Sequence, residues 1–384
     1  DSAKPLVAAI HGHALGGGLE ASMLCHYRIA VASAKVGLPE VLIGVLPGGG
    51  GTQRLPRLIG PQAALEMILS GRHVPADEAL RLGILDEVVS EGELLDAAVA
   101  FAERVASDPV RRIRDLDDKL KGFDPGIFDA MRKSIARKAR NQKAPYNCIK
   151  TVEACVSLPF DEGIAREREL FEELVNADEA KSLRYAFFSE RAARKVPGVP
   201  ATTPAREVAT VAVIGAGTMG GGIAMACANA GVPVKILERD TDSLERGLAK
   251  VRANYETSAK RGSISAEEME ARFGRIEGVQ EYEALAECDF VIEAVFEDMD
   301  VKKEVFGALD AVMKPGAILA TNSSALSIDE IAAHTSRPAD VIGTHFFSPA
   351  NIMKLLEIVR GDETAPDVIV TAMELGRRID KTVA

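Results

Sequence analysis

The chain has 384 residues, which is more than one ordinary domain contains, so two or more domains are expected. Hydrophobic residues make up 47% of the sequence, which excludes disorder as the main state. The net charge of −11 disfavours non-specific nucleic-acid binding, and no apolar run approaches the roughly 20 residues of a membrane span. The five scattered cysteines form no C-x-x-C pair, so we expect neither a metal site nor disulfides, and a reducing compartment fits best.

The pattern of apolar and turn-forming residues divides the chain into three parts. In the first part a strand is predicted at 6–10, a helix at 19–30, a loop rich in Gly and Pro at 46–52, and helices at 61–70 and 76–82. Residues 97–195 favour several amphipathic helices, and 195–207, with three prolines, favours an exposed connector. We therefore predict an α/β domain at 1–105, a helical linker region at 106–206 and a second α/β domain at 207–384. Both ends run into apolar segments, so we interpret the chain as a piece of a longer protein.

A glycine-rich turn follows the strand predicted at 208–214. Gly215, Gly217 and Gly220 have the spacing G-x-G-x-x-G, and a helical pattern follows directly. The first glycine permits a tight turn, the second lets a pyrophosphate approach the backbone, and the third lets helix and strand pack closely. Strand, turn and helix in this order predict a dinucleotide site, with a nucleotide-binding fold without redox chemistry as the alternative.

The next predicted strand, 232–237, ends at an acidic residue. Glu238 lies 18 residues after the last glycine of the turn, where a carboxylate binds the ribose hydroxyls of NAD and repels the extra phosphate of NADP. The adjacent Arg239 is an argument for NADP. On balance the sequence favours NAD.

Polar residues follow three further predicted strands, at 290–295, 317–320 and 341–343. In open α/β sheets, ligands bind at the carboxyl ends of the strands. His345 lies at one of these ends, and Glu357 follows 12 residues later. A histidine oriented by a carboxylate can accept the proton of an alcohol, whereas a structural histidine and a surface acid are the alternatives.

The motifs GAGTMG, FVIEAVFED, TNSSAL and THFFSPANIMKLLEIV occur in this order, and residues 208–384 resemble the NAD-binding domain of the 3-hydroxyacyl-CoA dehydrogenases. The resemblance implies a Rossmann-type doubly wound sheet, NAD as the cofactor, and His345 as a catalytic base with Glu357 as its partner. It also implies that Ser324 contacts both the substrate and the cofactor. The other implied cofactor contacts are Met219, Glu238, Val295, Glu297 and Lys302.

A second glycine cluster, at 16–18, lies between a predicted strand and a predicted helix. Free N–H groups at a helix start can stabilise an oxyanion, and Glu20 lies in the first helical turn. Glu40 follows 20 residues later, and two carboxylates around one water can divide acid and base roles. The alternatives are charge compensation at the helix start for Glu20 and a surface acid for Glu40.

The segments ALGGGLE, VGLPEVLIGVLPGGGGTQRLPRLIG and ADEALRLGILDEV resemble the second half of the crotonase (enoyl-CoA hydratase/isomerase) domain. This resemblance implies part of a ββα-spiral fold and places the paired catalytic glutamates at Glu20 and Glu40. It places an oxyanion N–H at Gly17, or at Gly18 if the register differs by one.

A crotonase domain, then helices, then a dehydrogenase resembles the multifunctional enzymes of fatty-acid β-oxidation. This order implies hydration of a 2-enoyl-CoA at the first site and NAD-dependent oxidation of the 3-hydroxyacyl-CoA at the second. Enoyl-CoA isomerisation at the first site and a catalytically silent NAD-binding scaffold are the alternatives. The resemblance further implies acyl-CoA ligands, a peroxisomal or bacterial cytoplasmic location, and either a monomer or a complex with a thiolase.

Overall fold

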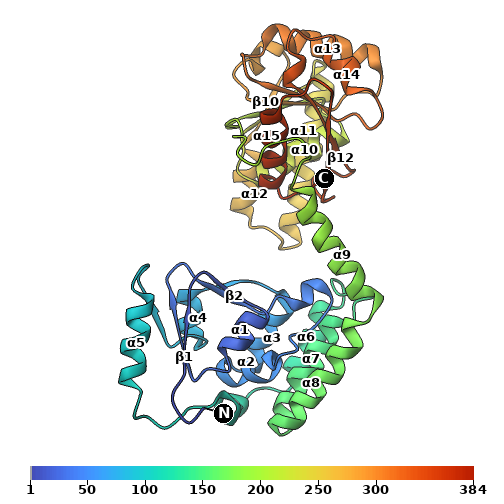
Figure 1. Ribbon diagram of the computed structural model, residues 1–384. Coiled ribbons are helices and arrows are strands. Elements are labelled where there is room, and N and C mark those ends of the chain that lie inside the picture. Colours follow the sequence, from blue (N-terminus) through green and yellow to red (C-terminus); the bar gives the residue numbers. More distant parts are fainter. Residues whose placement is uncertain (1) are drawn as a thin grey trace. The chain divides into compact units, whose positions relative to one another are not determined.

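A computed structural model describes residues 2–384, whose contacts divide the chain after Phe188 into two compact units (Figure 1). The predicted boundaries differ from this division. Helices α7 (Ala144–Ser157) and α8 (Phe160–Val175), which were expected in a separate linker region, lie side by side and pack on α2 (Gly51–Ile59) of the first unit (Figure 1). Their apolar faces complete the core of the first unit. In the described part of the chain, no helix is long and apolar enough to cross a membrane.

The first unit contains two small sheets. The first sheet is parallel, with β3 (Tyr27–Val31) between β1 (Val7–Ile10) and β6 (Glu87–Val89). The second has β4 (Lys35–Gly37) between β2 (His13–Leu15) and β5 (Val74–Pro75). Its other helices are α1 (Gly17–Ser22), α3 (Pro61–Ser70), α4 (Ala76–Leu82), α5 (Leu94–Arg104), α6 (Ile127–Ile135) and the short η1 (Glu40–Ile43), η2 (Ile113–Asp115) and η3 (Asp118–Leu120).

Two helices predicted from the sequence, α3 and α4, have the expected bounds, and each ends at a glycine with positive φ. The helix predicted at 19–30 is wrong, because α1 ends at Ser22 and the chain then enters β3. The buried Arg28 on this strand donates to the carbonyl of Ile84 at 2.7 Å and pairs with Asp86 at 3.3 Å. These contacts come from distant parts of the chain and outweigh the local helical pattern.

The predicted connector follows α9 (Asp178–Ala193) and lies within the second unit, because the division after Phe188 falls inside that helix. Residues 195–207 contain no helix or strand, as predicted, and are exposed or half-buried, whereas the strand predicted from 208 begins at Val211. Val196, Val199 and Val208 nevertheless pack against the core of the second unit. Arg206 pairs with Asp340 at 2.7 Å and with Asp367 at 2.8 Å, so the last part of the connector is fixed to the second unit.

The second unit is built on one eight-stranded sheet, in the order β14-β13-β12-β11-β10-β7-β8-β9. All neighbours are parallel except β12 and β13. The strands are β7 (Val211–Ile214), β8 (Val234–Leu237), β9 (Ile276–Val279), β10 (Phe290–Glu293), β11 (Ile318–Thr321), β12 (Val341–Phe346), β13 (Leu355–Arg360) and β14 (Thr382–Val383). The helices are α10 (Thr218–Asn229), α11 (Thr241–Lys260), α12 (Ala266–Phe273), α13 (Met299–Val312), α14 (Ile328–Ala332), α15 (Pro366–Arg378) and the short η4 (Tyr282–Leu285) and η5 (Pro338–Asp340).

The order of the strands reverses between β7 and β10. From β7 the chain first builds β8 and β9 on one side and then β10, β11 and β12 on the other. Strands β7, β10 and β11 are fully buried, as expected where helices cover both faces of a parallel sheet. This is the doubly wound arrangement predicted for the segment, and a crevice forms where the strand order reverses.

Candidate functional site

The turn between β7 and α10 has the geometry that a pyrophosphate needs. Gly215 has φ 99°, a conformation that favours glycine. A Cβ at Gly220 would lie 1.9 Å from the carbonyl oxygen of Gly215, so only glycine permits this close packing. A Cβ at Gly217 would meet nothing within 4 Å, which leaves open space beside the first turn of α10. The turn therefore fits a dinucleotide held at the helix N-terminus.

A cavity of about 800 Å³ opens beside this turn. The carboxylate of Glu238, at the end of β8, accepts a hydrogen bond from the N–H of Ala216 at 3.3 Å and lines the cavity. Five of the predicted cofactor residues line it, namely Gly215, Gly217, Met219, Glu238 and Val295, whereas Gly220, Glu297, Lys302 and Ser324 do not.

Basic residues of α11 also line this cavity, and the sequence analysis did not select them. Arg246 and Lys250 lie four residues apart and so on one face of the helix. The Nζ of Lys250 lies 2.9 Å from the hydroxyl of Thr218, in the first turn of α10. The sequence signal that could have found them is their spacing of four residues in the helix that follows Glu238.

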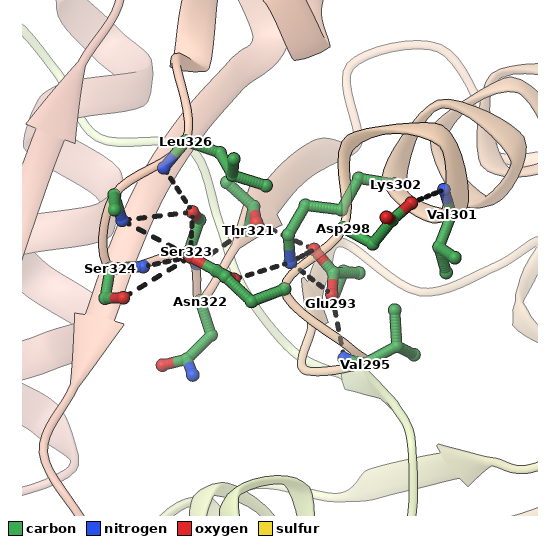
Figure 2. Close-up of polar contacts among 12 residues, drawn as sticks. Glu293, Val295, Asp298, Val301, Lys302, Thr321, Asn322, Ser323, Ser324 and Leu326 are labelled. Atoms are coloured by element: carbon green, nitrogen blue, oxygen red, sulfur yellow. Dashed lines mark hydrogen bonds and ion pairs between the residues drawn. The ribbon is translucent and has the colours of Figure 1, made fainter.

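A buried ion pair joins the end of β10 to α13 (Figure 2). Lys302 is 1% exposed and Glu293 is 0% exposed, and the Nζ of Lys302 lies 2.9 Å from both carboxylate oxygens of Glu293. Glu293 also accepts hydrogen bonds from the N–H of Val295 at 2.8 Å and from the hydroxyl of Thr321 at 2.7 Å. The structure therefore places Lys302 in the protein interior rather than on the cavity lining.

Glu297 connects this ion pair to the turn after β11. Its carboxylate lies 3.3 Å from the Nζ of Lys302 and accepts hydrogen bonds from the Ser323 hydroxyl at 2.6 Å and the Ser324 N–H at 2.8 Å. Burial acts to raise the pKa of Glu297, but the hydrogen bonds from Ser323 and Ser324 and the charge of Lys302 outweigh it and lower the pKa. The exposed Ser324 is thus held by a carboxylate that stays ionised.

His345 and Glu357 lie opposite each other on the antiparallel strands β12 and β13. The Nδ1 of His345 lies 2.8 Å from the Oε2 of Glu357. When Glu357 is ionised it can only accept, so Nδ1 carries the proton, and Nε2 of a neutral ring can accept another. The structure brings together the two residues predicted as base and partner.

In the first unit, Glu20 is held by the loop after η1. Glu20 is 7% exposed, and its Oε1 accepts hydrogen bonds from the N–H of Gly49 at 2.7 Å and the N–H of Gly51 at 2.8 Å. A Cβ at either glycine would lie under 3 Å from this carboxylate. The two donors fix the orientation of the Glu20 carboxylate.

Glu40 has a different environment. Its Oε2 is buried without a hydrogen-bond partner among the described residues, and its Oε1 would lie 2.9 Å from a Cβ at Gly16. Burial, together with the neighbouring carboxylates of Glu20 and Glu167, raises the pKa of Glu40 to about 7. The two predicted glutamates thus lie in different environments, as an acid and a base require.

Both predicted oxyanion donors lie at the start of α1. Gly17 and Gly18 are its first two residues, so their N–H groups have no acceptor within the helix. A Cβ at either position would meet nothing within 4 Å, so each N–H belongs to an accessible stretch of backbone. Both remain proposed oxyanion donors.

One buried carboxylate of the first unit was not predicted. Glu167, on α8, accepts hydrogen bonds from the N–H groups of Gly50 and Thr52. Burial raises the pKa of Glu167 to about 7, although these hydrogen bonds and the one from the Thr52 hydroxyl act to lower it. The available signal was its position in the apolar stripe of α8, which includes Leu170 and Leu174.

Comparison with known families agrees with this geometry. Residues 1–123 match the enoyl-CoA hydratase/isomerase family, and residues 210–384 match the NAD-binding domain of 3-hydroxyacyl-CoA dehydrogenase. The chain thus joins a segment that matches the enoyl-CoA hydratase/isomerase family to one that matches the NAD-binding domain of the dehydrogenase family. The predicted combination of a crotonase-type domain with a Rossmann-type domain is therefore confirmed.

Longer curated proteins are similar to nearly the whole chain. A peroxisomal bifunctional enzyme of Cavia porcellus is 46% identical, over 98% of the chain and 53% of the relative. The human peroxisomal bifunctional enzyme is 44% identical, with the same coverage. A peroxisomal fatty acid beta-oxidation multifunctional protein of Arabidopsis thaliana is 41% identical, over 99% of the chain and 53% of the relative. The chain thus spans about half the length of these curated relatives.

Proposed function

We propose that the protein hydrates a 2-enoyl-CoA at the first site and oxidises the resulting 3-hydroxyacyl-CoA at the second, with NAD as the cofactor. One observation carries this proposal. Glu20 and Glu40 lie in the unit that matches the enoyl-CoA hydratase/isomerase family, and Glu40 has a raised pKa. His345 and Glu357, which are in contact, lie in the unit that matches the 3-hydroxyacyl-CoA dehydrogenase family. The product of the first reaction is the substrate of the second. Since its relatives carry peroxisomal names, we place this activity in peroxisomes.

In the first reaction the two glutamates have separate roles. Glu20, held by the N–H groups of Gly49 and Gly51, orients a water and accepts its proton as the oxygen attacks Cβ. Glu40, with its raised pKa, is the acid that gives a proton to Cα. The free N–H of Gly17 or Gly18 stabilises the negative charge on the thioester oxygen.

In the second reaction His345 accepts the hydroxyl proton of the substrate at Nε2. Glu357 accepts the hydrogen bond from Nδ1 and stabilises the imidazolium that forms. NAD supplies the acceptor for the hydride that leaves the same carbon. The turn at Gly215 and Gly217 would hold its pyrophosphate, and Glu238 its ribose. Glu297 holds the backbone of Ser324, the residue that we propose as a contact of both substrate and cofactor.

The direct test is an assay of both reactions with the full-length protein. It should hydrate crotonyl-CoA without any cofactor, and it should reduce NAD when given 3-hydroxybutyryl-CoA. A full-length protein that reduces NAD but does not hydrate crotonyl-CoA would refute the role of the first site. Hydration without NAD reduction would refute the role of the second.

The hydration rate should fall as the pH rises through about 7. Because burial raises the pKa of Glu40 to about 7, its protonated form dominates below this pH and is lost above it. If this proton goes to Cα, kcat/KM falls about tenfold per pH unit on the alkaline side. A pH profile of crotonyl-CoA hydration measures this, and a rate that stays level up to pH 9 would contradict the assignment of Glu40 as the acid.

Replacing Glu238 with Ala should weaken NAD binding and narrow the preference over NADP. The ribose hydroxyls lose a charged acceptor, and such a hydrogen bond contributes about 1.5–3 kcal/mol. Calorimetric titration with both dinucleotides measures the change. The control is Glu245→Ala, which changes an exposed acid of the following helix, α11. An unchanged affinity for NAD would show that Glu238 does not bind the ribose.

A further inference from the structure

Residues 48–52, here called the glycine loop, end the loop after η1 and begin α2, and they lie between two carboxylates. Glu20 accepts the N–H groups of the loop's second and fourth residues, as described above. Glu167 accepts the N–H of Gly50 at 2.7 Å on its Oε1, and on its Oε2 the N–H of Thr52 at 3.0 Å and the Thr52 hydroxyl at 2.5 Å. Successive N–H groups of the loop therefore point alternately to Glu20 and to Glu167.

Helix α8 packs directly against this loop. A Cβ at Gly48 would lie 2.5 Å from the ring of Phe171, and a Cβ at Gly163 would lie 2.2 Å from the Oε1 of Gln53. Phe171 and Glu167 lie four residues apart and so on the same face of α8. Glu167 is 1% exposed, so the loop donors replace water as its hydrogen-bond partners.

We propose that Glu167 is a positioning residue for the hydration reaction, since it holds the glycine loop from the side opposite Glu20. The inference rests on the proposed function of the first site. With the N–H groups of Gly50 and Thr52 fixed on Glu167, those of Gly49 and Gly51 stay directed at Glu20 and keep its carboxylate in place. Glu167 lies outside residues 1–123, which match the hydratase/isomerase family, so a helix from the following segment completes the site.

A glutamine cannot take over this role, although it has the same shape. Both carboxylate oxygens of Glu167 accept, whereas an amide offers one acceptor and one donor. In Glu167→Gln the NH₂ group would face a loop N–H, and the loop would shift away from α8. A shift of about 1 Å in a catalytic group lowers the rate on the order of 100-fold.

The test uses the full-length protein and crotonyl-CoA. For Glu167→Gln we expect hydration kcat to fall about 10-fold to 100-fold, with KM within about twofold of the original value. Oxidation of 3-hydroxybutyryl-CoA by the same preparation should not change, because its residues lie in the other unit. Glu172→Gln, an exposed change on the same helix, is the matched control and should leave both rates unchanged.

A second variant keeps the test decisive if Glu167→Gln does not fold. Thr52→Val removes one of the three donors to Glu167 and should lower hydration kcat by a smaller factor. In the double variant the two losses should not add, since both break the same contact. Unchanged kcat in either folded single variant, or fully additive losses, would overturn the inference. A starting protein without hydration activity would instead refute the proposed function.

Discussion

Hydration of crotonyl-CoA should fall by about 10²–10⁴-fold when Glu40 is replaced by Gln, because the reaction then loses the residue that we propose as its general acid. The amide has nearly the same shape as the carboxyl group, so the pocket formed with Gly16 is retained. Oxidation of 3-hydroxybutyryl-CoA should be unchanged, since Glu40 belongs to the first unit. Separate assays of the two reactions on one preparation measure both effects.

The matched control for this variant is Glu66→Gln, which changes an exposed acid of the same unit. It should leave both activities unchanged. If Glu40→Gln lowered both reactions by the same factor, the two sites would not be independent. If it lowered neither, Glu40 would be no more than a buried structural acid.

Oxidation of 3-hydroxybutyryl-CoA should fall by a similar factor, about 10²–10⁴-fold, when His345 is replaced by Ala. The variant removes the group that we propose as acceptor of the hydroxyl proton and leaves Glu357 without its hydrogen bond. NAD affinity should change little, because His345 does not line the dinucleotide cavity. Steady-state kinetics and a calorimetric titration with NAD separate the two quantities.

His334→Ala is the control for this variant, since His334 is an exposed histidine of the second unit whose ring contacts the carbonyl of Glu330. Both activities should survive that change. A His345→Ala protein that still oxidised the substrate at the original rate would show that another group accepts the proton.

The parts of the two sites that lie within one local motif could be predicted from the sequence. The turn at Gly215 and Gly217 follows from the spacing of glycines between a strand and a helix. The pairing of His345 with Glu357 depends only on two neighbouring strands whose register brings them together. Local geometry was enough for the turn, whereas the pairing of His345 with Glu357 was implied by the family resemblance.

The parts that depend on packing between distant segments could not be predicted. Glu167 and Gly50 are separated by 117 residues in the sequence, and only the packing of α8 against the glycine loop brings them together. The resemblance implied that Lys302 is a cofactor contact, but its side chain is buried on Glu293. In the segment 19–30, pairing of β3 with β1 and β6 replaced the helix that the local pattern favoured.

The central claim is that one chain holds two independent sites that act in sequence. A mixing experiment tests it most directly, with crotonyl-CoA and NAD supplied together and NADH formation recorded. Glu40→Gln protein alone and His345→Ala protein alone should each form little NADH, whereas an equal mixture should restore rapid formation, because the hydrated product passes from one variant to the other. Rapid NADH formation by either variant alone, or none by the mixture, would contradict the account.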